Sequence, residues 1–181
     1  MVRVGIAGIG YIAEEYIKLF TQGKIRDAVI TALSSRNETH MQEIDARYGL
    51  GAALYTDYDA MLQSGCIDMV MICTPHFYHP NMAVRAIEAG IHTMIEKPVG
   101  VWPEELDRLM ACVSSHPEVQ SGVLYCRRAN PVFAKIKQLL TNGAIGQLKR
   151  VTWIITDMYR PSAILMRWTG EAPTTARAAE C

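Results

Sequence analysis

The sequence predicts an α/β fold built around a parallel sheet, and three observations support this prediction. From residue 2 to about residue 125, short apolar runs alternate with stretches of helical period. Most of the runs are apolar on both faces, as in strands that are covered by helices on both sides. A glycine-rich segment also lies between the first apolar run and the first helical stretch. Strands that alternate with helices in this way form parallel sheets.

Six short strands are expected in this region, at residues 3–7, 29–33, 52–55, 69–73, 93–95 and 119–125. Apolar stripes with members at i, i+3, i+4 and i+7 mark three helices between them. The stripes consist of Ala13, Tyr16, Ile17 and Phe20, of Ala83, Ala86, Ile87 and Gly90, and of Leu106, Leu109, Met110 and Val113. Gly90 stands where a helix would end and Pro103 where the next would begin.

The alternation changes after Tyr125, where a second domain is expected to begin. The pattern predicts a helix that ends at Asn142-Gly143, with Val132, Ile136, Leu139 and Leu140 facing inward, and then a long strand over residues 147–157. We therefore expect a first domain over residues 1–125 and the incomplete start of a second α/β domain over residues 126–181. Residues 171–181 carry neither a strand nor an amphipathic helix pattern, so this tail is expected to be disordered.

Composition and charge exclude several classes of protein. The chain has 18 Lys and Arg against 18 Asp and Glu, a balance that argues against a nucleic-acid partner. No apolar run approaches the roughly 20 residues that cross a bilayer, and no signal-peptide pattern precedes the first strand, so we expect a cytoplasmic protein without membrane contact. The five cysteines contain no Cys-x-x-Cys pair, and His76 and His79 lack further ligands at suitable spacing. Neither a disulfide framework nor a metal site is expected.

The glycine-rich segment at residues 8–13, Gly-Ile-Gly-Tyr-Ile-Ala, matches the pattern G-x-G-x-x-G/A. In a strand-to-helix context, Gly8 would allow the tight turn, Gly10 would leave the backbone bare against a pyrophosphate, and Ala13 would let the helix approach the strand. Tyr11 and Ile12 complete the segment at the start of the helix. The alternative is that the glycines only form a sharp turn. We interpret the segment as the phosphate site of a dinucleotide-binding, or Rossmann, domain.

The end of the second strand indicates which dinucleotide is bound. NAD enzymes usually carry an acidic residue here for the ribose 2′-hydroxyl, whereas this chain has Leu33-Ser34-Ser35-Arg36-Asn37. The Ser35 hydroxyl and the Arg36 guanidinium suit a 2′-phosphate, because a guanidinium can bind two phosphate oxygens at once. We predict NADP as the cofactor, with NAD possible. The alternative is that Arg36 is a solvated loop residue.

Residues 68–98 contain three ordered motifs: Thr74-Pro75 followed by His79, Ala89-Gly90-Ile91-His92, and Glu96-Lys97-Pro98. Together with the glycine loop, this set resembles the Gfo/Idh/MocA family of NAD(P)-dependent oxidoreductases over about residues 2–160. The resemblance implies a Rossmann domain followed by an α/β domain that carries substrate residues and the oligomer interface. It also implies hydride transfer between nicotinamide and a carbinol or carbonyl carbon of a sugar, inositol or related polyol.

The resemblance assigns roles to residues at the strand ends. Lys97 would be the catalytic residue, contacting the reacting oxygen of the substrate and the nicotinamide ribose, and an ammonium group there stabilises negative charge on that oxygen. Glu96 would pair with a neighbour or orient the lysine, and the Lys97-Pro98 peptide is expected to be cis. Thr74 and Pro75 would form a wall near the nicotinamide. For His79, a contact on the cofactor side and a helix-capping role remain open.

Two later segments, at residues 127–131 and 153–161, resemble the inositol 2-dehydrogenase branch of the family. Arg128, Tyr159 and Arg160 are the substrate candidates, because a polyol requires many hydrogen-bond donors. The alternative is that these residues are solvated or lie between domains.

Family members are considerably longer and carry a proton-transfer histidine in their second half. The five histidines of this chain all lie within residues 1–125, so that histidine has no counterpart, and we expect a truncation or frame shift near residues 162–171. A full-length form is expected to be a homo-oligomer. Two functions remain open: an oxidoreductase, and a non-catalytic NADP-binding module with a redox-sensing or partner-binding role.

Overall fold

The computed structural model describes residues 1–154. The chain divides into two compact units, Met1–Asn130 and a second that begins at Pro131. The tail at residues 171–181, for which disorder was expected, lies outside the described residues.

The first unit contains a six-stranded sheet in the order β3-β2-β1-β4-β5-β6, and every pair of neighbours is parallel. The strands are β1 (Val2–Ala7), β2 (Ala28–Ser34), β3 (Ala53–Tyr55), β4 (Met69–Ile72), β5 (His92–Ile95) and β6 (Ser121–Val123). All six predicted strands are confirmed, with ends that differ by one or two residues. The order of the strands reverses between β1 and β4, where ligands of such sheets bind at the carboxyl ends of the strands.

The three predicted helices of the first unit are also confirmed as α1 (Tyr11–Thr21), α4 (His79–Glu88) and α5 (Pro103–Ser115). Gly90, just beyond α4, has a φ of 74°, and Pro103 is the first residue of α5. The periodicity did not reveal four shorter or weaker elements: α2 (Glu38–Tyr48), α3 (Tyr58–Gln63), the 3₁₀ turn η1 (His76–Tyr78) and α6 (Cys126–Ala129). In α2 the buried side chains are Met41 and Ile44, and most of the other residues from Glu38 to Tyr48 are polar or charged, so the apolar pattern is weak.

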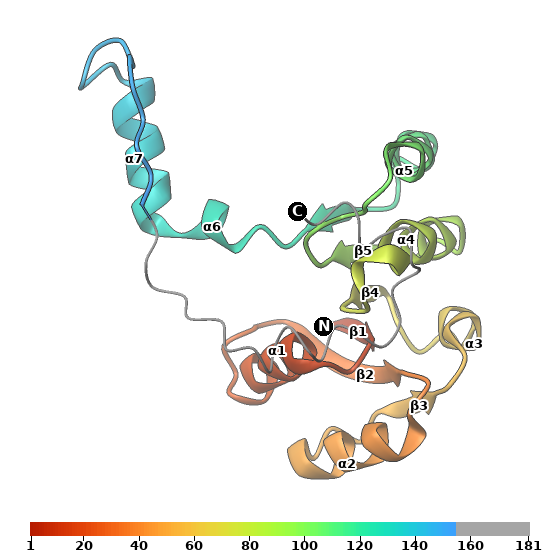
Figure 1. The fold of residues 1–181 in the computed structure, drawn as a ribbon. Coiled ribbons are helices and arrows are strands. Elements are labelled where there is room, and N and C mark those ends of the chain that lie inside the picture. Colours follow the sequence, from red (N-terminus) through yellow and green to blue (C-terminus); the bar gives the residue numbers. More distant parts are fainter. Residues whose placement is uncertain (155–181) are drawn as a thin grey trace. The chain divides into compact units, whose positions relative to one another are not determined.

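Helices cover both faces of this sheet (Figure 1), and core residues lie on both sides of it. Helices α1 and α2 cover one face, around Ile6, Ile17 and Leu33, and helices α3, α4 and α5 cover the other, around Ile72 and Ile87. Because both faces are buried, the strands are apolar on both sides, which explains why they appear in the sequence as continuous apolar runs. The carboxyl ends of the strands form the edge of the sheet at which ligands of such folds bind.

The second unit departs from the prediction in two respects. Helix α7 (Pro131–Thr141) forms where expected, but the stripe predicted to face inward is exposed, with relative exposures from 38% to 62% at Val132, Ile136, Leu139 and Leu140. The strand predicted over residues 147–157 is absent from its described part, residues 147–154. No other described segment pairs with these residues, and a strand without a partner leaves its backbone groups unsatisfied. The rings of Phe133 and Trp153 stack with centroids 5.2 Å apart.

Candidate dinucleotide site

The glycine segment forms the turn between β1 and α1. Gly8 has a φ of +86°, and its amide donates to the main-chain oxygen of Ser34 at 2.8 Å. A Cβ atom on Gly8 would lie 2.7 Å from the backbone nitrogen of Thr74. Both the backbone conformation and the close approach therefore require glycine at this position. The turn after β1 is thus packed directly against the segment that follows β4.

Gly10 has a different environment. It is the N-cap residue of α1 with an ordinary φ of −105°, and no side chain caps the first turn of this helix. A Cβ atom on Gly10 would meet nothing within 4 Å. The space beside Gly10 is therefore open and no side chain caps the first turn of α1, which is the arrangement that an anion at a helix N-terminus requires. Ala13 is buried, whereas Tyr11 is 80% exposed and Ile12 is 37% exposed.

The segment after β2 lies beside this turn. The Ser35 amide donates to the main-chain oxygen of Tyr55 at 3.1 Å, and the Ser35 hydroxyl accepts from the Asn37 amide at 3.3 Å. The Asn37 side chain in turn caps α2 by accepting from the His40 amide at 3.0 Å. Arg36 is exposed on this ordered turn. No carboxylate occurs between Leu33 and Asn37.

The ring of His79 connects the ends of two strands. Its exposure is 1%; Nε2 lies 2.7 Å from the main-chain oxygen of Thr74, and Nδ1 lies 2.8 Å from that of Pro98. Both main-chain oxygens are acceptors, so the ring of His79 is the donor side of these contacts. Thr74 is half-buried, and Pro75 beside it is exposed. The segments after β4 and β5 are therefore held together through His79.

Lys97 follows β5 through the buried residue Glu96. The Glu96 amide donates to the main-chain oxygen of Ile72 at 3.0 Å, which extends the pairing of β5 with β4. Its carboxylate accepts from the Lys97 amide at 2.9 Å through Oε2 and from the Tyr16 hydroxyl through Oε1. The Lys97-Pro98 peptide is cis, as predicted. The Lys97 side chain is exposed, and its ammonium group forms no ion pair within residues 1–154.

Burial dominates the electrostatics around Glu96. Desolvation, together with the hydrogen bond to Glu96 and the charge of that residue, raises the pKa of Tyr16 well above its ordinary value. Burial, with a smaller effect of the Glu96 charge, raises the pKa of the Cys73 thiol to about 12. At neutral pH, Tyr16 is therefore a hydrogen-bond donor, and Cys73 is a neutral thiol rather than a nucleophile.

Among the sequence candidates, contacts in the first unit connect Gly8 with Thr74, and His79 with the segments that follow β4 and β5. Arg128 is exposed on the short helix α6, and Tyr159 and Arg160 lie outside the described residues. The apolar periodicity predicts Tyr16 only as a member of a stripe and gives no sign of its contact with Glu96. The available signal was chemical, since a buried carboxylate needs hydrogen-bond donors and a half-buried tyrosine hydroxyl can supply one.

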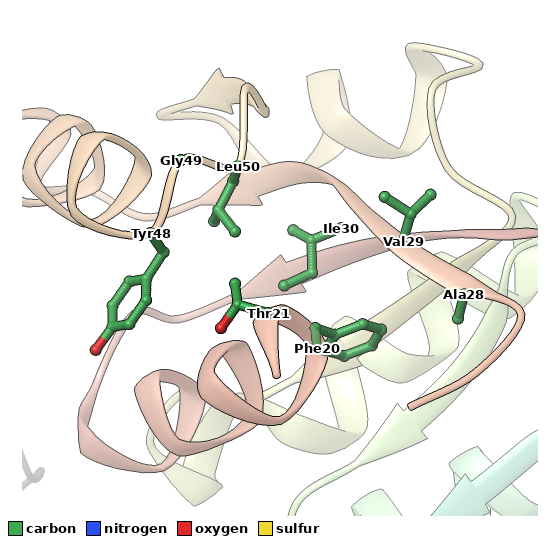
Figure 2. A pocket seen from close by; sticks show the side chains of 8 residues that line it. All are labelled: Phe20, Thr21, Ala28, Val29, Ile30, Tyr48, Gly49 and Leu50. Atoms are coloured by element: carbon green, nitrogen blue, oxygen red, sulfur yellow. The ribbon is translucent and has the colours of Figure 1, made fainter. Parts of the chain in front are cut away.

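Outside this edge of the sheet, three features bear on other kinds of site: a cavity in the first unit, the grouping of possible metal ligands, and the length and apolar character of the helices. A cavity of about 190 Å³ opens beside the first half of β2 and the C-terminal ends of α1 and α2 (Figure 2), at the opposite end of β2 from Ser35. It is lined by Phe20, Thr21, Ala28, Val29, Ile30, Tyr48, Gly49 and Leu50. Within residues 1–154, no group of three or more His, Cys, Asp and Glu residues could hold a metal ion. No helix in the described part of the chain has the length and apolar character needed to span a membrane.

Comparison with known proteins extends this description. Uncharacterized oxidoreductase ORF334 of Rhizobium meliloti is 31% identical over 159 residues, which cover 87% of this chain and 46% of that protein. Inositol 2-dehydrogenase 1 of Saccharopolyspora erythraea is 26% identical over 179 residues, or 98% of this chain and 51% of that protein. The chain thus spans about half the length of the curated relatives it matches.

Among solved structures, scyllo-inositol dehydrogenase of Lactobacillus casei with bound NAD(H) and scyllo-inositol superimposes with a TM-score of 0.76 at 26% identity. The superposition covers 81% of this chain and 42% of that one. A sequence model of the oxidoreductase family with an NAD-binding Rossmann fold matches residues 2–123, the region of the parallel sheet and of the glycine loop. The chain therefore belongs to this oxidoreductase family, Gfo/Idh/MocA, which its motifs resemble.

Proposed function

We propose that this chain is the coenzyme-binding part of an NADP-dependent oxidoreductase that transfers a hydride between nicotinamide and a CH–OH carbon of a sugar, inositol or related polyol. One observation carries the proposal: the uncapped start of α1 at Gly10 lies at the same edge of the sheet as the Glu96-Lys97 segment. The names of the relatives, an inositol 2-dehydrogenase and a scyllo-inositol dehydrogenase with NAD(H), support the class of substrate.

The residues at this edge fit a dinucleotide. The open space at Gly10 and the free amides of α1 suit a pyrophosphate, with Gly8 and Ala13 allowing the close approach and Tyr11 and Ile12 at the rim. When bound, the coenzyme supplies the acceptor or donor of the hydride. Ser35 and Arg36 would hold the adenosine ribose, and the absence of a carboxylate in residues 33–37 favours a 2′-phosphate and hence NADP over NAD.

In this proposal, Lys97 donates a hydrogen bond to the reacting oxygen of the substrate. As a carbinol is oxidised, that oxygen loses its proton, and the ammonium group stabilises the negative charge that develops. Thr74 and Pro75 would form the wall beside the nicotinamide, with His79 and Glu96 on the same side. Arg128, Tyr159 and Arg160 are the proposed substrate donors, the last two beyond the described residues.

The same proposal includes a domain boundary near residue 125, a cytoplasmic location and a homo-oligomeric full-length form. These features follow from the sequence pattern and from the family resemblance. The boundary lies close to Asn130, the last residue of the first compact unit.

The experiment that tests the function combines binding with turnover. The purified chain is titrated with NADPH and with NADH by fluorescence, and is then assayed as a dehydrogenase against a panel of inositols and aldoses. We expect saturable binding of NADPH that is tighter than that of NADH. Binding without turnover on any substrate would support the non-catalytic NADP-binding module. A chain that is folded by circular dichroism and binds neither coenzyme would overturn the proposal.

A further inference from the structure

One buried carboxylate joins two parts of the first unit that are far apart in the sequence. Glu96 is 6% exposed, and two groups donate to it: the Lys97 amide at 2.9 Å and the hydroxyl of Tyr16, 80 residues away. Burial of a carboxylate is unfavourable unless donors surround it, so both hydrogen bonds are needed to hold it in place. The Tyr16 hydroxyl is therefore one of the two donors that hold the Glu96 carboxylate in position.

The two ends of this connection have different roles in the proposed function. Tyr16 lies on α1, the helix that begins without a side-chain cap beside the open space at Gly10. Glu96 immediately precedes Lys97 and binds its amide, so the position of the carboxylate sets the position of the lysine backbone. The helix that would bind the pyrophosphate and the segment that carries the lysine are thus linked by hydrogen bonds through a single side chain.

We propose that Tyr16 is a positioning residue, which fixes Lys97 relative to α1 by holding the Glu96 carboxylate. This inference rests on the proposed function, because it assigns Tyr16 to the nicotinamide half of the coenzyme site. Tyr16 does not contact the reacting atoms; it acts through Glu96. Loss of its hydroxyl frees the Glu96 side chain and lets the Lys97 segment move while the glycine turn stays intact.

Tyr16→Phe is the direct test, because it removes the hydroxyl and keeps the ring. Tyr58→Phe is the control: Tyr58 is buried, whereas Tyr16 is half-buried, and the Tyr58 hydroxyl donates to the Met82 main-chain oxygen at 3.0 Å instead of to Glu96. Both variants lose one partly buried hydrogen bond from a tyrosine hydroxyl, so a general loss of stability occurs in both.

The first measurement compares NADPH with its fragment 2′,5′-ADP, which lacks nicotinamide. We expect Tyr16→Phe to weaken NADPH binding by about three- to tenfold and to change the affinity for 2′,5′-ADP by less than about twofold. Tyr58→Phe should leave both affinities near those of the wild type. Equal effects of the two variants on NADPH, or equal losses for NADPH and its fragment in Tyr16→Phe, would contradict a positioning role.

The second measurement needs no coenzyme. Amide hydrogen exchange of Lys97, followed by NMR, should be about fivefold faster in Tyr16→Phe than in Tyr58→Phe, since the acceptor of that amide is no longer held. If the wild type binds neither NADPH nor NADH, the proposed function fails, and this exchange rate still decides whether Tyr16 holds the Lys97 segment. Identical exchange in the two variants overturns the inference.

Two substitutions of Glu96 test whether its hydrogen bonds are what positions Lys97. In Glu96→Gln, the amide oxygen can still accept from the Lys97 amide while the amide nitrogen donates to the Tyr16 oxygen, so the link is retained. In Glu96→Ala, the link is lost. We expect Glu96→Gln to keep slow Lys97 exchange and Glu96→Ala to behave like Tyr16→Phe. Equal exchange rates in the two Glu96 variants would show that the hydrogen-bonded link does not position Lys97.

Discussion

At the scale of single residues, the predicted preference for NADP over NAD depends on Arg36. Its guanidinium is exposed on the turn after β2, where a 2′-phosphate would accept charge-assisted hydrogen bonds. Such a bond contributes about 1.5 to 3 kcal/mol, so Arg36→Ala should weaken NADPH binding roughly ten- to a hundredfold and leave NADH binding nearly unchanged. Isothermal titration calorimetry with both coenzymes checks this prediction. Arg26→Ala, an exposed arginine just before β2, is the control, and equal losses for NADPH and NADH would refute the assignment.

The two glycines of the turn should respond differently to substitution, although both stand in the same motif. Gly8→Ala places a Cβ atom 2.7 Å from the Thr74 nitrogen at a φ of +86°, so it should lower the free energy of unfolding by about 1 to 3 kcal/mol or more. Gly10→Ala has an ordinary φ and open space, so stability should change by less than about 0.5 kcal/mol. Urea denaturation measures both values.

Gly10→Ala should weaken coenzyme binding although it hardly changes stability. A methyl group at Gly10 would fill the space that the pyrophosphate needs, so Gly10→Ala should weaken NADPH binding by about tenfold or more while the fold persists. Fluorescence titration of this folded variant is the measurement. If Gly10→Ala binds NADPH as tightly as the wild type, the pyrophosphate does not lie against Gly10.

At the scale of elements, an ion pair at the amino ends of β1 and β4 links these neighbouring strands. Hydrogen bonds from the Arg3 side chain and from the Arg3 amide lower the pKa of Asp68 to about 2. A carboxyl group with a lowered pKa in the folded state stabilises the fold above its unfolded pKa of about 3.9, and this stabilisation is lost as the pH falls toward 2.

The measurement for this ion pair is the pH dependence of urea unfolding between about pH 5 and pH 2. The wild type should lose stability through this window, and Asp68→Asn should show a smaller decrease because it lacks the titrating carboxyl group. The stability gained from Asp68 is modest, since the side chains of Arg3 and Asp68 are 45% and 39% exposed and solvent screens their interaction. A parallel decrease in both proteins would mean that Asp68 contributes nothing measurable.

Elements also differ in how well their sequence pattern defines them. Periodicity reveals helices α1, α4 and α5, because each carries an apolar stripe that is at least partly buried. The buried members are Ala13 and Ile17 in α1, Ala83, Ala86 and Ile87 in α4, and Leu109 in α5, whereas Met110 of the α5 stripe is exposed. Helix α3 has only six residues and starts at the cap residue Asp57, so it lacks the length for a periodic pattern. In α7 the periodicity predicts the helix correctly but not the burial of its stripe.

For the whole molecule, coenzyme binding should raise stability through linkage. If NADPH binds the folded chain only, a concentration about 100 times its dissociation constant adds about 2.7 kcal/mol to the free energy of unfolding. Chemical denaturation of the chain with and without NADPH tests this value, and 2′,5′-ADP at the same multiple of its own constant should give the same gain. No gain with either ligand would contradict binding at the glycine turn.

The parallel sheet, the positions of its strands and the strand-to-helix turn at Gly8 follow from the sequence alone. These features depend on neighbours in the chain: apolar runs, helical period and the backbone freedom of glycine are local properties. The family resemblance adds the predicted role of Lys97, and the chemistry of the residues after β2 adds the predicted role of Arg36. Both residues follow strands, whose positions come from the order of the elements.

Tertiary structure alone decided which distant groups meet. Gly8 packs against Thr74, His79 lies between the main-chain oxygens of Thr74 and Pro98, and Tyr16 donates to Glu96, 80 residues along the chain. A periodic pattern shows which face of an element is apolar. It does not show which element covers that face, or which group forms a hydrogen bond with a polar atom within it. That choice depends on the packing of whole elements, which is why Tyr16 was recognised as a stripe residue and not as the donor to Glu96.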